Sequence, residues 1–427
     1  MAHRHSLTTD ISKASLLLAA VTIALATIGG ALVAGAQRPV FRSAVDLVSV
    51  QVAVVDDEGR PIESLAPGAF EVTIDGRRRR VVSADFIGHS DRETATELDM
   101  SPAALAAAAR TLVVAIDAGS FDPGTTTGPL EAISEVLNSA GPLDRIGLYA
   151  YPGDRWIPPS TARAPLRVAI HAVAGRRVTL RSTYNLRPWE IVDITAQSTN
   201  PNSFLAGTAG RGGASLGAFD PVVQIQRREC PGDGDCLMRI YAEGMSLATQ
   251  LERQTQESLA GLQRLLTALG ALPGRKTILL VSGGLVVSDR SDGRPDVGTL
   301  SRTFSQAAAR ANVTVYAVHF SGSSSAAGPA PRTTAAGEQQ HRALALTGNW
   351  LEQFANATGG HRLHVQAGTG AVAFTRVLRE TSGYYLLGVE STAADRDDTP
   401  RRLRVRVDHR NATVRSREWI VLPRPAP

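Results

Sequence analysis

An unbroken run of apolar and β-branched residues at 111–116 constrains the fold of this chain more than any other stretch. The run shows no alternation between apolar and polar side chains, which is typical of a strand buried on both faces. It ends on Asp117, which is followed by Ala118, Gly119 and Ser120. Because open α/β sheets hold ligands at the carboxyl ends of their strands, Asp117 is a candidate for meeting a cation or a polar group of a partner. The alternative is that Asp117 only caps the turn or helix that follows.

Similar buried runs recur along the chain and alternate with helical patterns. Apolar runs predict further buried strands at 145–150, 277–281 and 313–318. Helical patterns lie at 129–140, 166–174, 188–196, 237–269, 300–311, 350–357 and 371–382. This alternation predicts a doubly wound, mostly parallel α/β sheet with helices on both faces, in a domain covering residues 107–390. The Gly-, Ser- and Asn-rich stretch 197–236 is interpreted as an insertion loop in that domain.

The two ends of the folded part show the period of two that is typical of β-strands. Four valines carry this alternation in residues 41–88, and Leu403, Val405 and Val407 carry it in residues 402–422. Each segment therefore has one apolar face that needs a partner, and neither has enough apolar residues to close a core alone. We expect the two segments to form one small β-sandwich that flanks the α/β domain.

Three shorter features complete this outline. The polar and acidic stretch 89–106 is expected to be a linker. The stretch 384–389 is apolar on both faces, so we expect it to be the last strand of the α/β sheet rather than a part of the sandwich. Asp75-Gly76 predicts a hairpin turn, and the four arginines at 77–80 that follow it are interpreted as a solvated face.

The first 36 residues have the pattern of a signal peptide. Arg4 and Lys13 precede the uncharged stretch 14–36, which closes on the small-x-small pattern Ala34-Gly35-Ala36. Cleavage there places the mature chain in the periplasm, the cell envelope or the extracellular space. The alternative is an uncleaved anchor, because the stretch is about long enough to span a bilayer. Nothing later in the sequence approaches a membrane span, so none is expected after cleavage.

The two cysteines and the charge of the chain bear on its partners. Cys230 and Cys236 flank a Gly- and Pro-containing turn, and in an oxidising compartment such a close pair predicts a disulfide that pins the turn. The formal net charge is +5 and the aromatic share is 5%, spread along the chain. A nucleic-acid-binding surface would cluster its charge with aromatic residues between, so we expect no nucleic-acid partner.

Five stretches together resemble proteins with a von Willebrand factor type A (VWA) domain. Order and spacing are most similar to the secreted bacterial proteins often labelled "VWFA-related". The five stretches are 48–61, 65–76, 272–284, 312–318, and 357–360 followed by 384–388. The resemblance covers almost all of the mature chain except the insertion, and it implies a doubly wound sheet.

The resemblance also implies a metal-ion-dependent adhesion site at the carboxyl ends of the strands. In that family Asp-x-Ser-x-Ser, a Thr and a second Asp hold Mg²⁺, a hard cation that prefers oxygen ligands, and a partner's carboxylate completes the shell. Asp117 matches the first Asp. Gly119 and Phe121 stand where the two serines are expected, and Gly283 stands in place of the second Asp.

The remaining candidate metal ligands are therefore few. Thr183 is a possible match to the Thr, while Ser120 and Asp122 are displaced oxygen donors. Together with Asp117 they form a poor set for Mg²⁺, because only hydroxyls and one well-placed carboxylate remain. We expect a degenerate site with weak or no Mg²⁺ binding and no other cofactor.

Two functions follow from these observations. The first is a non-enzymatic adhesion or protein-protein interaction module whose partner is another protein. The second is an exported hydrolase-like enzyme whose catalytic residues are not visible in the sequence. Ser282-Gly283-Gly284 lacks the Gly-x-Ser-x-Gly pattern of a nucleophile elbow. The Gly-rich run at 207–213 lacks the Lys-Ser or Lys-Thr of a phosphate loop, and the histidines are scattered.

Overall fold

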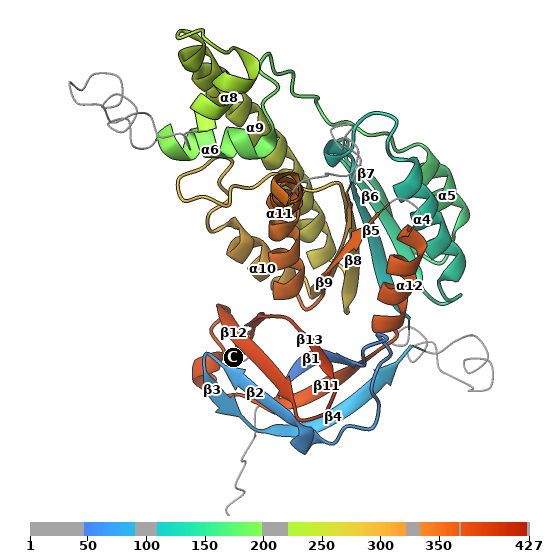
Figure 1. Ribbon diagram of the computed structural model, residues 1–427. Coiled ribbons are helices and arrows are strands. Elements are labelled where there is room, and N and C mark those ends of the chain that lie inside the picture. Colours follow the sequence, from blue (N-terminus) through green and yellow to red (C-terminus); the bar gives the residue numbers. More distant parts are fainter. Residues whose placement is uncertain (1–46, 90–108, 199–220, 322–333, 367–368, 425–427) are drawn as a thin grey trace, which may run out of the picture. The chain divides into compact units, whose positions relative to one another are not determined.

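The computed structural model describes residues 47–89, 109–198, 221–321, 334–366 and 369–424 of the 427-residue chain (Figure 1). The expected signal peptide, nearly all of the expected linker 89–106 and the middle of the expected insertion lie outside these residues. No helix in the described ranges combines the length and the apolar character needed to cross a membrane.

A six-stranded, mostly parallel sheet forms the centre of the α/β part. Its strands are β5 (Thr111–Asp117), β6 (Arg145–Tyr151), β7 (Arg155–Ser160), β8 (Lys276–Ser282), β9 (Val313–Phe320) and β10 (Arg362–Val365). Their order is β10-β9-β8-β5-β6-β7, and only β7 runs antiparallel to its neighbour. The apolar run at 111–116 is thus the central strand, which explains why both of its faces are apolar.

Helices cover both faces of this sheet, as the alternation of strands and helices predicts. One face carries α4 (Thr127–Ser139), α5 (Ala164–His171) and α12 (Gly370–Glu380), and the other carries α9 (Cys236–Gly270), α10 (Leu300–Arg310) and α11 (Thr334–Ala357). Successive residues of β5 enter the two cores in turn: Leu112 and Val114 pack under α4, whereas Val113 and Ala115 pack under α9.

Strands from both ends of the chain pair in two antiparallel sheets. The first has the order β13-β1-β11-β4, with β1 (Leu47–Val55), β4 (Val81–Gly88), β11 (Gly383–Glu390) and β13 (Thr413–Ser416). The second has the order β14-β12-β2-β3, with β2 (Phe70–Ile74), β3 (Arg77–Arg79), β12 (Pro400–Val407) and β14 (Trp419–Val421). The alternating residues Val50, Val72, Leu387 and Leu403 meet in one core between these sheets.

The prediction for the stretch 384–389 is wrong. This stretch lies in β11, which pairs with β1 and β4 in the sandwich and not with any strand of the six-stranded sheet. Tyr385 and Leu387 point into the sandwich core, and the Tyr385 hydroxyl donates a hydrogen bond of 2.8 Å to the carbonyl oxygen of Ile62. The strand has apolar residues on both faces because its other face, with Tyr384 and Leu386, is also partly buried.

Other boundaries also differ from the predictions. The stretch interpreted as an insertion loop contains α8 (Pro221–Glu229), whose Val222 and Ile225 are buried. Helix α11 begins at Thr334 instead of at residue 350, and β7 and β10 were not predicted. Of the four arginines at 77–80, three form β3, and Arg79 makes an almost buried ion pair of 2.7 Å with Asp395 instead of facing water.

A separate core, formed by helices alone, lies at the amino-terminal half of α9. It is formed by α6 (Pro188–Ser198), α8 and the first turns of α9, which we call together the helical cap. Ile191, Ile225, Ile240 and Leu247 pack in this core, apart from the leucines of the carboxyl-terminal half of α9 that cover the sheet. Helix α9 has 35 residues and is therefore about 52 Å long, enough to serve both cores.

Candidate functional site

The candidate site lies at the carboxyl ends of β5 and β8. β5 ends on Asp117, and a single 3₁₀ turn, η2 (Ala118–Ser120), follows it directly. β8 ends on Ser282, and the middle of α9 brings Ser258 to the same place. Asp117 is only 1% exposed and Ser282 is fully buried, so the cluster is closed to solvent.

Serine hydroxyls satisfy both carboxylate oxygens of Asp117. Ser258 Oγ donates a hydrogen bond of 2.9 Å to Oδ1, and Ser282 Oγ lies 3.2 Å from Oδ2. Gly261, one turn after Ser258, makes this approach possible, because a Cβ there would lie 2.4 Å from the Tyr151 ring. A side chain at position 261 would therefore push α9 away from the strands.

Ser120 links the cluster to the backbone of both turns. Its hydroxyl donates a hydrogen bond of 2.6 Å to the carbonyl oxygen of Asp117 and accepts one of 2.7 Å from the backbone N–H of Gly283. Ser282 Oγ lies 3.2 Å from Ser120 Oγ and accepts a hydrogen bond of 3.0 Å from the N–H of Gly284. The turns after β5 and β8 are thus joined by side-chain hydroxyls.

Burial governs the electrostatics of Asp117. Loss of water raises the pKa of its carboxyl group from 3.8 to about 6, although the serine hydrogen bonds and the positive charge of Arg177 act in the opposite direction. Burial and the nearby Asp117 charge also raise the pKa of the Tyr151 hydroxyl well above its usual value. The Asp117 carboxylate is therefore a buried acid held by neutral donors, and among the described residues no cation contacts it directly; Arg177 donates instead to the carbonyl oxygen of Ser120.

The structure brings together only two of the four residues that the sequence proposes as metal ligands. Asp117 and Ser120 are neighbours, as described above. Asp122 turns toward Arg177, whose Nη1 lies 3.8 Å from its Oδ2. Thr183 is exposed in a turn of the chain near the helical cap.

The turn that holds Thr183 is anchored far from the cluster. The neighbouring Ser182 donates to Glu243 of α9, 15 residues before Ser258, which corresponds to about 22 Å along the helix. The possible match of Thr183 to the metal-binding Thr is therefore not supported by its position.

The residues present do not fit a Mg²⁺ site. Both Asp117 oxygens already accept hydrogen bonds, Phe121 is fully buried in the apolar core, and Gly119 offers no side chain. Among the residues that the structure describes, no three His, Cys, Asp or Glu side chains gather closely enough to bind a metal ion together. A hard cation would have to displace the serine hydroxyls before it reached the carboxylate.

His319 is a further buried polar residue at the same edge of the sheet, but it does not belong to the Asp117 cluster. The register pairs Ser282 of β8 with His319 of β9, so both side chains lie on one face of the sheet. His319 is 1% exposed, its Nδ1 lies 3.2 Å from Arg362 Nη1, and its Nε2 makes no hydrogen bond of normal geometry although the Gly283 backbone is adjacent.

The neutral state of His319 follows from its surroundings. Burial, and then the positive charge of Arg362, lower the pKa of its imidazole to about 4. The Ser282 hydroxyl is held by Asp117 and Ser120 and makes no hydrogen bond to His319. The adjacent serine and histidine are therefore not arranged as a nucleophile with its base.

Sequence reasoning missed Ser258, Ser282 and Arg177 as parts of the site. A signal for Ser258 was present: Thr255 and Ser258 are polar residues three apart on the otherwise apolar, buried stripe of α9. Polar residues on such a stripe require buried hydrogen-bond partners. Which partner they meet depends on the packing of α9 on the sheet, which no local pattern specifies.

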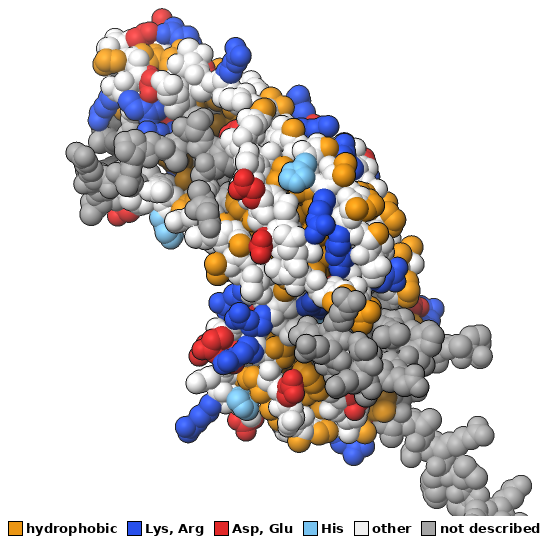
Figure 2. All heavy atoms as spheres, turned by 90° about the vertical axis from the view of Figure 1, so that its right-hand side faces the viewer, with side chains coloured by type: hydrophobic (Ala, Val, Ile, Leu, Met, Phe, Trp, Pro, Cys, Tyr) orange, Lys and Arg blue, Asp and Glu red, His pale blue; other side chains and the backbone are white. Residues whose placement is uncertain are grey.

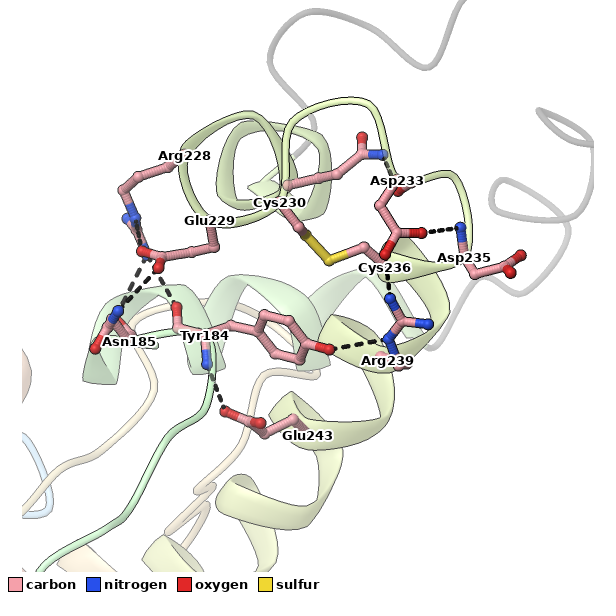
Figure 3. The surroundings of a disulfide bond; sticks show 11 residues. Tyr184, Asn185, Arg228, Glu229, Cys230, Asp233, Asp235, Cys236, Arg239 and Glu243 are labelled. Carbon is pink, nitrogen blue, oxygen red and sulfur yellow. Dashed lines mark hydrogen bonds and ion pairs between the residues drawn. A yellow bond between two sulfur atoms is a disulfide. The ribbon is translucent and has the colours of Figure 1, made fainter.

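The disulfide lies in the helical cap (Figure 3). Cys230, the residue after α8, is bonded to Cys236 at the start of α9. Arg239 spans this turn, because it pairs with Asp233 and donates a hydrogen bond of 3.0 Å from Nε to the Tyr184 hydroxyl. The bridge thus fixes the corner between two helices of the cap.

The sequence matches no protein-family model, and no curated protein shows significant similarity to it. The protein is a mixed α/β protein with a six-stranded, mostly parallel sheet and two antiparallel sheets.

Proposed function

We propose that this chain is an exported VWA-type protein that binds another protein and catalyses no reaction. Its place is the periplasm, the cell envelope or the extracellular space, as the N-terminal pattern indicates. The observation that carries the proposal is the saturation of Asp117 by Ser258 and Ser282 at the edge where such sheets hold ligands. Because this cluster leaves no free ligand for a metal ion, partner binding is independent of Mg²⁺ in this proposal, and the cluster is a degenerate form of a metal-ion-dependent adhesion site.

The helical cap is the surface that we assign to the partner. It is held firmly, because Arg342 of α11 forms ion pairs with Asp193 of α6 at 2.7 Å and with Asp289 at 2.9 Å. The disulfide holds its outer corner. Met238, on the first turn of α9, is 57% exposed, and flexible methionines are suited to protein contacts.

One other face of the protein shows no large patch of a single side-chain type. On the face drawn in Figure 2, acidic and basic side chains are interspersed among small groups of apolar ones. Such a mixed surface is ordinary for a folded protein and does not by itself define a binding patch.

Site-specific crosslinking tests the proposal. A photo-reactive amino acid replaces Met238 in the full chain, and a matched probe replaces Val82, which is 43% exposed on β4 of the sandwich. We expect the Met238 probe, and not the Val82 probe, to capture one discrete envelope protein, equally with EDTA or with Mg²⁺. Equal capture from both positions contradicts the role of the cap. Loss of capture in EDTA contradicts metal-independent binding.

A further inference from the structure

Three arginines form a row on the outer face of one sandwich sheet. β12 carries Arg402, Arg404 and Arg406 at alternate positions, and all three are exposed. Leu403 and Val405, which lie between them, are buried in the sandwich core. Side chains two positions apart on a strand point to the same face and are about 7 Å apart. The three arginines therefore stand in line along the solvent side of β12.

The register of the neighbouring strands adds a fourth arginine. β12, β2 and β3 are consecutive strands of one sheet (Figure 1). Arg404 pairs with Thr73 of β2, and Thr73 pairs with Arg78 of β3, so these residues share one face. Neighbouring strands are about 4.8 Å apart, which places the backbones of Arg78 and Arg404 about 10 Å apart. We call Arg78, Arg402, Arg404 and Arg406 together the arginine face.

Little negative charge compensates the arginine face. Arg402 Nη2 lies 3.7 Å from Glu418 Oε2, and both of these side chains are exposed. Glu71 stands opposite Arg406 in the register, but the two form no ion pair. Among the described residues, the three arginines other than Arg402 make no ion pair and no side-chain hydrogen bond. Like charges on neighbouring positions of a sheet repel one another, and an anionic partner would relieve that repulsion.

In the described part of the other sandwich sheet no such row occurs. Its outward positions on β1 and β11 include the neutral residues Ser49, Gln51 and Tyr384. A surface that serves only solubility typically mixes charges of both signs. The row on β12 therefore calls for an anionic partner rather than for water alone.

The composition of the face favours one class of anionic partner. A bilayer surface requires exposed apolar side chains that insert among the lipids, and none of the large exposed hydrophobic side chains of the described residues lies on β2, β3, β12 or β14. Single-stranded nucleic acid requires aromatic side chains on which its bases stack, and Trp419, which pairs with Arg402, is half-buried. The carboxylates of a protein segment need neither feature.

We propose that the arginine face binds an extended, acidic segment of another protein, in which carboxylates occupy alternate positions. Such a segment repeats its side chains at the same spacing as β12, about 7 Å, because both chains are extended. Each carboxylate then meets one arginine. The planar guanidinium offers two parallel N–H donors to the two oxygens of a carboxylate, which fixes the orientation of the pair.

This second contact surface is separate from the helical cap. The cap is built from α6, α8 and the first turns of α9, whereas the arginine face belongs to β12 and β3. The Val82 probe also lies elsewhere, on β4 of the other sandwich sheet. The inference thus goes beyond the proposed function. Its test uses a synthetic peptide and no envelope protein, so either proposal can fail without the other.

Binding of a labelled peptide to the full chain tests the arginine face. In the probe, four Glu alternate with Thr, and fluorescence anisotropy follows its binding at pH 7.5 in 10 mM NaCl. We expect saturable binding that weakens about tenfold in 150 mM NaCl, because the screening length falls from about 30 Å to about 8 Å. Absence of binding, or binding that does not respond to salt, overturns the proposal.

A second peptide tests the spacing. It has the same composition, but its four Glu are consecutive, so an extended chain presents only half of them to one face. We expect it to bind about threefold more weakly than the alternating peptide. Equal affinity of the two peptides contradicts an extended segment in register with β12. Binding of phosphatidylglycerol vesicles without binding of the alternating peptide assigns the face to a membrane and also overturns the proposal.

Arg404→Gln removes the central charge of the face and should weaken binding of the alternating peptide at least threefold. Arg404→Lys, which keeps the charge but loses the fork, should weaken it less. The matched control is Arg253→Gln, because Arg253 is an exposed arginine of α9 with no ion pair among the described residues. It makes the same change in net charge and should leave binding unchanged. Equal losses in Arg404→Gln and Arg253→Gln count against the site.

A combined variant gives the largest effect. Arg402→Gln, Arg404→Gln and Arg406→Gln together should weaken peptide binding at least tenfold. The three side chains are exposed, so the far-ultraviolet circular dichroism should not change. Unaltered affinity in this variant overturns the arginine face as a binding surface.

Discussion

Ser258 and Asp117 are 141 residues apart in the sequence, yet the Ser258 hydroxyl donates a hydrogen bond of 2.9 Å to Asp117 Oδ1. The contact joins the middle of α9 to the end of the central strand in a place closed to solvent. Four of the predictions below concern this contact, its surroundings and the disulfide that lies on the same helix.

Ser258→Ala should destabilise the protein. The substitution leaves one oxygen of a buried carboxylate without its donor, and a hydrogen bond to a charged group contributes about 1.5–3 kcal/mol to the free energy of unfolding. Urea unfolding at pH 7.5 measures the loss. Ser246→Ala is the matched control, because Ser246 is exposed on the same helix, and it should change the stability by less than about 0.5 kcal/mol. Equal effects of the two substitutions contradict the prediction.

Asp117→Asn should stabilise the protein at neutral pH and not at acid pH. The folded-state pKa of about 6 exceeds the unfolded value of 3.8, so the folded state binds the proton more tightly. The stability that this group contributes is complete below pH 3.8 and is lost as the pH rises through 6. The ionised carboxylate then costs up to about 3 kcal/mol, which Asn avoids.

Urea unfolding of the wild type and of Asp117→Asn at pH 4 and pH 7.5 checks this pH dependence. The difference between the two proteins should be small at pH 4 and should favour the variant at pH 7.5. A difference that is the same at both pH values shows that Asp117 does not titrate in this window.

Mg²⁺ should bind weakly or not at all. Gly119, Phe121 and Gly283 provide no oxygen ligands from their side chains, and the oxygens of Asp117 are already hydrogen-bonded. We expect no saturable heat in calorimetric titration with Mg²⁺ and no shift of the melting temperature with EDTA. Stoichiometric binding that disappears in Asp117→Ala would falsify the degenerate site and restore metal-dependent adhesion.

Cys230 and Cys236 should be oxidised in the exported protein, and alkylation without reductant should label neither. Replacing both with Ser should destabilise the helical cap by about 2 kcal/mol, because the bridge closes only a short loop. Hydrogen exchange should quicken in α8 while β5 stays protected. Free thiols in the native protein, or equal loss of protection in both elements, contradict this prediction.

Deletion of residues 403–427 should unfold the N-terminal strands and leave the six-stranded sheet largely intact. The deletion removes most of β12 and all of β13, the partners of β2 and β1. Hydrogen exchange on the truncated chain should show fast exchange in β1 and slow exchange in β8. Full protection of residues 48–54 in that chain shows that the N-terminal segment folds on its own.

The local sequence predicts those strands and helices in which each face is either wholly buried or wholly exposed. Residues 111–116 are recognisable as a central strand because every side chain in it must be apolar, whichever helix covers it. The alternating valines of β1 and the arginines of β12 likewise reveal one buried and one exposed face. In α8, by contrast, a helix escaped prediction because its short apolar pattern lies beside a Gly- and Ser-rich stretch.

The sequence by itself determined the alternation of strands and helices and the acid at the end of β5. It also determined that the β-segments at both ends of the folded part each have an apolar face that needs a partner. Only the tertiary structure decided that β11 belongs to the sandwich, that Ser258 reaches Asp117, and that Arg78 shares a sheet face with the arginines of β12. The physical reason is the range of the forces involved. Hydrophobic periodicity can be read from residues that are close in the sequence. The partner of a buried polar group, by contrast, depends on which distant element packs against it.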